Sequence, residues 1–369
     1  MKNLTATGTA GWTGVWLPHL LCLLMPLTAL GFALTGPHRW YEVLPWLLPQ
    51  LGIVLSDLYG PRHTADPDRA LPARPFDCLV YGQALLHFAA VGAAVWMASQ
   101  LDFSSWSRAL DAVADLAAVV WIVGTSSAIC AMVGGHELIH RRTSAEQTLG
   151  RLMLVTVLYE HFFTEHLRGH HARVATEQDP ATARFGETFN AFFARTVPAQ
   201  FRSAWRLEKA RLGDPAMSNL DLRMLRHRCL RGVAAEALLV GAVLTACGPL
   251  GVLAFALQAF TAVRELEAVN YMEHWGLKRR GRYVSELDSW DCDAASTHYV
   301  MVGLARHADH HAHATVPYQQ LRLNRASARL PFGYQAMVLM IEFRPAHFVK
   351  LMTEELRRRG LGPFQARAS

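Results

Sequence analysis

The chain has 369 residues, of which 51% are hydrophobic and only 18% are charged. This composition excludes a mostly disordered protein and, because the apolar residues form long runs, indicates a membrane protein. The net charge of +6 reflects 36 Lys and Arg against 30 Asp and Glu, and the 18 histidines are a second unusual feature. We attribute the basic excess to membrane topology rather than to nucleic-acid binding, because basic residues collect on the cytoplasmic side of membrane proteins.

Six segments are apolar and long enough to cross a bilayer, whose core of about 30 Å requires about 20 helical residues. The first is expected to be a retained span and not a cleaved signal peptide. The last two share one apolar stretch, which a Gly-Pro pair at Gly248 interrupts. The predicted spans are Trp12–Leu34, Tyr41–Tyr59, Cys78–Ala98, Leu110–Val133 and two within Gly232–Tyr271.

An even number of spans places both termini on one side, and strongly basic segments follow the fourth and the sixth span. That side is therefore predicted to be cytoplasmic. The expected fold is all-α, a polytopic membrane helical bundle with a cytoplasmic, histidine-rich helical cap. Its predicted parts are four transmembrane helices in 12–134, a cytoplasmic histidine-box region in 135–231, two transmembrane helices in 232–271, and a second cytoplasmic histidine-box region in 272–369.

Four histidine clusters lie at the cytoplasmic ends of spans or in the two cytoplasmic regions. The first, GHELIHR from Gly135, carries two histidines at i and i+4, which lie on one face of a helix. Alone, this HExxH motif is typical of a zinc protease with Glu137 as base. The other clusters are EHLRGHH from Glu165, NYMEHWG from Asn270 and HADHH from His307.

Together the clusters supply nine imidazoles, more than one ion can use but enough for two. The three histidines of the second cluster are expected to converge on one centre. These nine candidate metal ligands are His136, His140, His166, His170, His171, His274, His307, His310 and His311. A metal site at the mouth of an apolar bundle suits an apolar substrate and the oxidation of an unactivated C–H bond. Iron is therefore the expected metal, with zinc as the alternative.

The remaining sequence features limit the other possibilities. The six cysteines form no CxxC pair, which excludes a zinc ribbon or a fused rubredoxin. There is no GxGxxG fingerprint for a nicotinamide or flavin, so any reductant must be oxidised by separate proteins. Three further histidines, His161, His298 and His313, lie near the clusters and are candidates for contacts to the ligands.

At these four clusters the sequence resembles the alkane 1-monooxygenase branch of the membrane fatty acid desaturase and hydroxylase superfamily. The matching segments are HELIHRR, EHLRGHHARVATEQDPATAR, NYMEHWGLKR and ARHADHHAHATVPYQQLR. The resemblance implies a non-haem di-iron centre held by the nine histidines, a substrate channel along the helix bundle, and electrons from rubredoxin or ferredoxin with its reductase. Departures include Trp275, where the family has Tyr, and Ala305-Arg306 before the last histidines.

The resemblance also suggests roles for acidic residues beside the ligands. Such an acid could accept a hydrogen bond from the second N–H of an imidazole and so orient the ring. Alternatively, it could form an ion pair with Arg141 or Arg168 on the helix surface. A weaker candidate for orienting an imidazole is Asp179. The four acids placed beside the iron ligands in this way are Glu137, Glu165, Glu273 and Asp309.

The expected reaction is hydroxylation of the terminal carbon of a medium-chain alkane or alkyl chain with O2, at the inner membrane of a bacterium. One alternative is oxidative decarboxylation of a free fatty acid to a 1-alkene, or desaturation, as the resemblance to membrane 1-alkene-forming decarboxylases suggests. That reaction needs a cation for the carboxylate, for which Arg62, Arg141, Arg142 and Arg306 are candidates. A non-enzymatic metal-binding or metal-transport protein fits less well. Transporters bind their ions near the midplane of the bilayer, whereas these histidines are predicted to lie beyond the ends of the spans.

Overall fold

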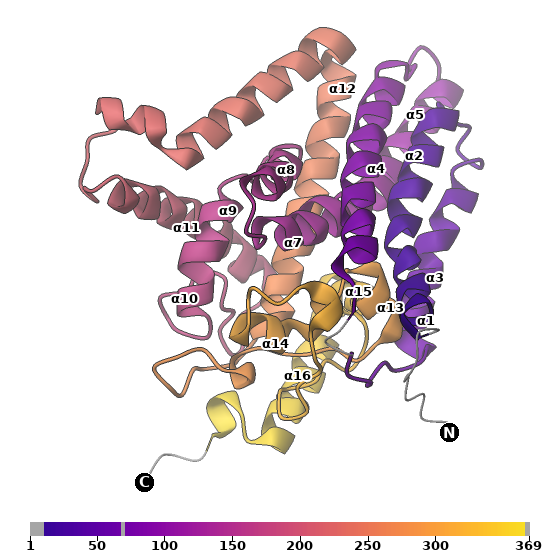
Figure 1. Ribbon diagram of the computed structural model, residues 1–369. Coiled ribbons are helices and arrows are strands. Elements are labelled where there is room, and N and C mark those ends of the chain that lie inside the picture. The colour runs from indigo at the N-terminus through magenta and orange to yellow at the C-terminus, as the bar shows by residue number, and fades with distance from the viewer. Residues whose placement is uncertain (1–10, 68–70, 366–369) are drawn as a thin grey trace.

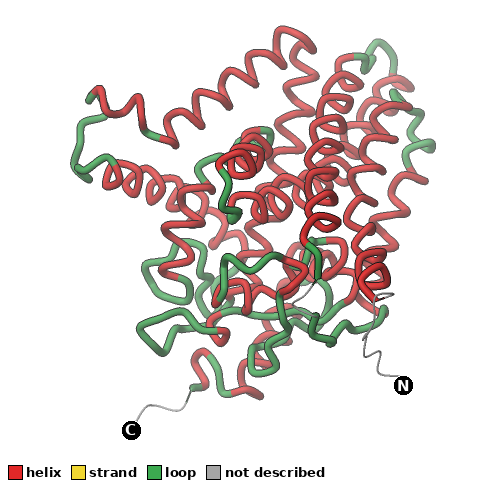
Figure 2. The backbone as a smooth tube through the Cα atoms, viewed as in Figure 1, coloured by secondary structure: helices red, strands yellow, loops and turns green. Residues whose placement is uncertain are grey.

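The computed structural model of the chain describes residues 11–67 and 71–365. Within these ranges the chain is helical and has no β-strand, only two isolated bridge pairs (Figure 2). The predicted all-α class is therefore confirmed. The α-helices are α1 (Gly11–His19), α2 (Leu24–Thr35), α3 (Leu48–Tyr59), α4 (Ala73–Ser99), α5 (Trp106–Ala118), α6 (Thr125–Ser127), α7 (Gly135–Ile139), α8 (Ser144–Val155), α9 (Phe162–Glu165), α10 (His171–Arg173), α11 (Phe189–Arg211), α12 (Arg228–His274), α13 (Ala295–Val300), α14 (His307–Ala312), α15 (Tyr334–Phe343) and α16 (Pro345–Arg359).

Shorter helical turns of other types connect these helices. Three of them are π-helices, which have a wider turn than an α-helix and are frequent at functional sites. The π-helices are η3 (Val119–Gly124), η4 (Ala128–Gly134) and η5 (His166–His170). The 3₁₀ turns are η1 (Leu20–Leu23), η2 (Leu44–Leu47), η6 (Leu222–Arg226), η7 (Glu286–Asp288), η8 (Leu304–Arg306), η9 (Tyr318–Gln320) and η10 (Gly362–Phe364).

Four helical segments of the described chain are long and apolar enough to span a membrane, which agrees with an integral membrane protein. They are Gly14–Thr35, Ala73–Ser99, Trp106–Ile139 and Arg228–His274. The expected span 41–59 is instead shorter, because a loop and η2 precede the 12 residues of α3. The total of six spans thus stays a prediction.

Helix α12 covers the segment predicted to hold the last two spans. It bends sharply at Gly248, whose φ of 66° and ψ of −169° are not helical. Glycine reaches this positive φ without steric cost, and Pro249 lacks the N–H that would continue the helical hydrogen bonds. Figure 1 shows the two arms of α12 diverging from this point, the second running down beside α4 toward the histidine clusters.

The bundle packs through small side chains and exposes large ones. Alanines on α4 are buried where it meets α2 and the second arm of α12, and alanines on α12 face them. Small residues allow helix backbones to approach closely in a membrane. Leucines such as Leu85 and Leu238 remain exposed on the outside of the bundle, as expected where lipid covers the surface.

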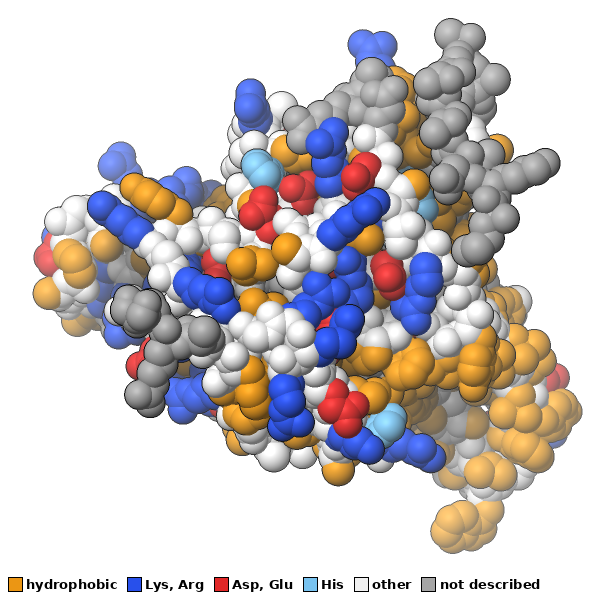
Figure 3. Space-filling model, turned by 90° about the horizontal axis from the view of Figure 1, so that it is seen from below, with side chains coloured by type: hydrophobic (Ala, Val, Ile, Leu, Met, Phe, Trp, Pro, Cys, Tyr) orange, Lys and Arg blue, Asp and Glu red, His pale blue; other side chains and the backbone are white. Residues whose placement is uncertain are grey.

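The histidine clusters and the C-terminal helices lie together toward one end of the bundle, around and below the lower parts of α4 and α12 in Figure 1. Helix α15 packs against α3 and α12 and is part of the core of this end. Figure 3 views the same end directly, and Lys and Arg side chains are spread over it. The opposite end carries exposed aromatic residues, Trp40, Tyr41, Phe103 and Trp106, as interfacial residues do in membrane proteins.

Candidate metal centre

All nine histidines named above come together at this end, in two groups. Within each group one nitrogen from every imidazole lies within 4.8 Å of those from the others. The first histidine group is His136, His140, His166, His171 and His310, and the second histidine group is His170, His274, His307 and His311. The short helices η5, α10 and α14, the end of α12, and α7 with the residue that follows it, His140, carry the candidate ligands.

Local helix type decides which group each histidine joins. On the α-helix α14, His307 and His311 are four residues apart and share the second group, while His310 points to the first. In the wider turn of the π-helix η5, which α10 follows directly, His171 lies beside His166, with 3.0 Å between their Nε2 atoms. His170 is thereby directed to the second group. The expectation that this cluster converges on one centre is wrong.

The nitrogen positions match those of atoms sharing an ion. In the first group His166 Nε2 lies 2.9 Å from His140 Nε2 and 3.0 Å from His171 Nε2. In the second group His311 Nε2 lies 2.9 Å from His307 Nε2 and 3.3 Å from His170 Nε2. Nitrogens bound to one ion at about 2.1 Å are separated by about 3.0 Å in octahedral and 3.4 Å in tetrahedral geometry. Both groups therefore fit a metal ion.

Burial favours the neutral, metal-binding form of six of the nine imidazoles. Loss of solvent is the main cause of their lowered pKa, and neighbouring histidines lower the pKa further. The Nε2 atoms of His136 and His310 are also buried, with no hydrogen-bond partner among the described residues, and so are free to coordinate. The pKa is lowered well below its ordinary value for His140, His166, His171, His307, His310 and His311.

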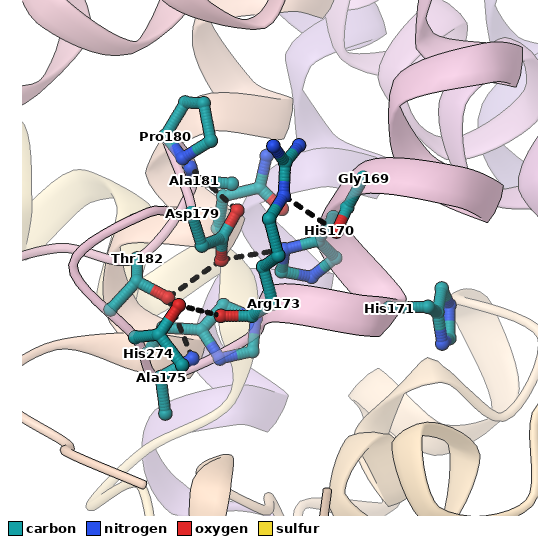
Figure 4. Close-up of polar contacts among 12 residues, drawn as sticks. Gly169, His170, His171, Arg173, Ala175, Asp179, Pro180, Ala181, Thr182 and His274 are labelled. Atoms are coloured by element: carbon teal, nitrogen blue, oxygen red, sulfur yellow. Dashed lines mark hydrogen bonds and ion pairs between the residues drawn. The ribbon is translucent and has the colours of Figure 1, made fainter. Parts of the chain in front are cut away.

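Asp179 supports the second histidine group from a loop that follows α10. Its carboxylate accepts a hydrogen bond from His170 Nδ1 at 2.9 Å and another from the hydroxyl of Thr182 at 2.6 Å (Figure 4). Burial pushes the pKa of Asp179 upward, but His170 and these hydrogen bonds outweigh it, and the net pKa is lowered. The ionised carboxylate fixes the proton of His170 on Nδ1 and leaves Nε2 available for a metal.

A narrow apolar cavity ends at the two groups. His136 and His166 from the first group and His307 from the second form part of its wall, next to Glu273. Its other lining residues come mainly from η4, α9, the second arm of α12, η8 and α15. Most of them are apolar: Ala128, Ile129, Met132, Val133, Phe162, Leu266, Val269, Met301 and Leu304. Such a cavity is suited to an extended apolar chain whose end reaches the metals.

The comparison with known proteins agrees with this geometry. The sequence profile described as fatty acid desaturase matches residues 114–339, a range that contains all nine histidines. The chain belongs to the fatty acid desaturase family. It is 31% identical to an alkane 1-monooxygenase of Alcanivorax borkumensis, over 93% of this chain and 84% of the relative. It is 35% identical to one of Pseudomonas aeruginosa, over 89% and 87% of the two chains.

A third relative of this desaturase-family chain, the alkane 1-monooxygenase of Ectopseudomonas oleovorans, is 31% identical over 82% of this chain and 73% of its own length. The predicted family and the predicted class of enzyme, an oxidoreductase of the monooxygenase type, are confirmed by these matches. The histidine groups and the family together support metal binding.

Of the four predicted acids, Glu273 alone has a described hydrogen bond or ion-pair contact with one of the nine candidate ligands. Glu273 Oε2 lies 3.1 Å from His307 Nε2, and its Oε1 accepts a hydrogen bond of 2.6 Å from the hydroxyl of Tyr334. The second group has four imidazoles against five in the first, so Glu273 is placed where a further oxygen donor can complete it. Tyr334 was not expected from the sequence, because it lies 61 residues from Glu273.

The other three acids have different partners in the structure. Glu137 forms an ion pair of 2.8 Å with Arg141, and Glu165 forms one of 2.6 Å with Arg173. Asp309 contacts His313 at 3.0 Å and accepts a hydrogen bond from the backbone N–H of Arg322. Among the described residues, these three acids form no hydrogen bond with the nine histidines. Arg141, Arg173 and the backbone N–H of Arg322 lie closer and pair with them instead.

The remaining histidines of interest lie outside the two groups. His298 packs against His63 and His19, with ring centroids 4.6 and 5.3 Å away, and His161 packs against Tyr159. One contact that the sequence did not suggest is the backbone carbonyl of Asp288, 3.4 Å from His274 Nδ1. A backbone partner of this kind leaves no signal in the residue types.

Proposed function

We propose that this chain hydroxylates the terminal carbon of medium-chain alkanes or alkyl chains, using O2 and two irons held by the nine histidines. The observation that carries this proposal is the position of both histidine groups at the end of a narrow apolar cavity. Relatives that match nearly the whole chain are alkane 1-monooxygenases, which supports the same substrate class here. One atom of O2 would enter the alcohol and the other would leave as water, consuming two electrons and two protons.

The donor set suits iron, because neutral imidazole is a good ligand for it. When bound, the irons would supply the activation of O2 and the removal of a hydrogen atom from the substrate. The chain's own residues prepare the site: Asp179 fixes the tautomer of His170, and Tyr334 holds Glu273 beside His307. The apolar cavity excludes water and presents only the chain end to the histidines, which is selection by positioning.

The cavity favours an uncharged chain over a fatty acid. Its lining contains no Lys or Arg among the described residues, and its two acidic members, Glu265 and Glu273, offer no positive charge to hold a carboxylate. The arginines considered for this role lie elsewhere. Arg62 pairs with Asp293, Arg141 with Glu137 and Asp77, Arg306 donates to the backbone carbonyl of His63, and Arg142 is exposed.

We further propose that the histidine end, with residues 135–231 and 272–369, faces the cytoplasm at the inner membrane of a bacterium. The spread of Lys and Arg over this end supports that orientation. Electrons would come from rubredoxin or ferredoxin with its reductase. A small acidic carrier of this kind suits a basic docking face, because opposite charge accelerates association.

Product analysis separates the two reactions. The purified protein, supplied with iron, a rubredoxin and its reductase, is incubated with dodecane and separately with lauric acid. We expect 1-dodecanol from dodecane and about two irons per chain. Formation of 1-undecene from lauric acid without alcohol from dodecane would establish the decarboxylase instead, and zinc in place of iron would exclude both oxidative reactions.

A further inference from the structure

One polar cluster interrupts the apolar wall of the cavity. Glu265 on α12 accepts a hydrogen bond of 2.6 Å from the hydroxyl of Thr125 on α6 and one of 3.3 Å from the amide of Gln335 on α15. The amide of Gln50 on α3 donates in turn to Thr125 at 3.1 Å. Glu265 and Gln335 both line the cavity. Four separate elements thus converge to hold one carboxyl group at the cavity wall.

Glu265 has no cationic partner among the described ion pairs. The neighbouring Arg264 points elsewhere, to Glu342 at 2.7 Å and to Asn190 at 2.9 Å. An acidic side chain within a membrane span is costly and therefore indicates a functional role. Uncharged donors, the Thr125 hydroxyl and the Gln335 amide, hold Glu265 in place, so the cavity keeps a hydrogen-bonding carboxyl group in a largely apolar wall.

The cluster lies one substrate length from the histidines. Glu265 and Glu273 are eight residues apart on the same helical arm, and both line the cavity, so they are separated by about 12 Å along the helix. With carbon–carbon bonds of about 1.5 Å in a zigzag, an extended chain of ten carbons is also about 12 Å long. A chain whose terminal methyl group meets His136 and His307 would place its other end beside Glu265.

We propose that this cluster binds a hydroxyl group at the far end of the substrate, so that the protein also hydroxylates medium-chain 1-alkanols at their methyl end and forms α,ω-diols. This inference rests on the proposed function. Each oxygen of Glu265 accepts one described hydrogen bond, and a carboxylate has about four acceptor positions, so a hydroxyl can donate to one that is unused. The reaction is the one proposed for an alkane: one oxygen atom of O2 enters the product, the other leaves as water, and two electrons and two protons are consumed.

The test compares decane with 1-decanol in the complete system, with wild type, Glu265→Gln and Glu265→Leu. We expect the wild type to form 1,10-decanediol from 1-decanol. The ratio of kcat/KM for 1-decanol to that for decane should fall about tenfold in Glu265→Leu, because the hydrogen bond to the substrate hydroxyl is lost. The nearly isosteric Glu265→Gln should give a smaller fall. Glu342→Gln, which removes an acid outside the cavity, is the matched control and should leave the ratio unchanged.

Two results would overturn this inference while leaving the proposed function intact. One is oxidation of 1-decanol only at its hydroxyl-bearing carbon, which would mean that the alcohol binds in the reverse orientation. The other is a ratio that neither Glu265 variant changes. If Glu265→Leu does not accumulate, the ratio in Glu265→Gln decides. Absence of any product from decane in the wild type would instead contradict the proposed function itself.

Discussion

The two histidine groups share ligands from η5 and α14 but are supported differently. The first has five imidazoles, and none of them accepts or donates a described hydrogen bond to a carboxylate. The second has four, with Asp179 on His170, Glu273 beside His307 and a backbone carbonyl near His274. The second group therefore has one imidazole fewer but more oxygen atoms around it. We expect its metal binding to depend more strongly on these neighbouring residues than metal binding in the first group does.

Removal of one imidazole should produce the largest effect, and it should differ between the groups. His274→Ala leaves the second group with three imidazoles, whereas His140→Ala leaves the first with four. We expect His274→Ala to lose at least a hundredfold in dodecane hydroxylation and about half of the bound iron, and His140→Ala to lose less iron. Iron quantitation and product analysis measure both effects, with the exposed His347→Ala as control. Equal iron loss in the two variants would remove the proposed asymmetry.

Asp179→Asn should have the next largest effect. Asparagine keeps the shape of the side chain but removes the negative charge that fixes the tautomer of His170. Loss of such a partner typically costs 10–100-fold in metal affinity or activity, and we expect a fall in this range in both. Glu177→Gln, an exposed acid in the same loop, is the control and should behave as wild type. Unchanged iron affinity in Asp179→Asn would show that His170 is oriented by packing alone.

The sequence predicted the members of this site better than their arrangement. Spacings of four residues, such as that of His136 and His140, point to candidate ligands because such residues lie on one face of an α-helix, and the structure places both in the first group. The division of the groups was not predictable, because it depends on the π-helical turn η5, which sends His170 and His171 to different groups. Residue types give no direct signal for such a turn.

The supporting acids and the spans show the same limit. Proximity in sequence to a ligand suggested Glu165, yet Arg173, eight residues away, forms an ion pair with it. Asp179 supports His170 only because its loop turns back toward the helix end. Hydropathy predicted the long helices well, but prolines at 45 and 49 break the second apolar segment into shorter pieces. Side-chain partners that are brought together by tertiary contacts, and the points at which helices are interrupted, cannot be predicted from local sequence patterns.

Glu273→Gln should have a moderate effect confined to the second group. The amide keeps one oxygen near His307 but loses the charge, so we expect a several-fold fall in activity and weaker binding of one of the two irons. Tyr334→Phe, which removes the hydroxyl that holds Glu273, should give a smaller fall of the same kind. Titration with an iron chelator measures the affinities. Glu165→Gln changes an equally buried acid that contacts no imidazole, and similar iron loss there would contradict the role of Glu273.

The smallest effect should come from Asp309→Asn, although Asp309 lies between two predicted ligands in sequence. Its carboxylate contacts His313 and the backbone N–H of Arg322, which fasten the loop after α14 and not an imidazole of either group. We expect less than a threefold change in activity, unchanged iron content and a loss of stability of about 1 kcal/mol. Iron quantitation and thermal unfolding in detergent measure these effects. If Asp309→Asn lost iron as Asp179→Asn is expected to, a carboxylate would support the first group as well, and the difference between the two groups would lie only in the number of imidazoles.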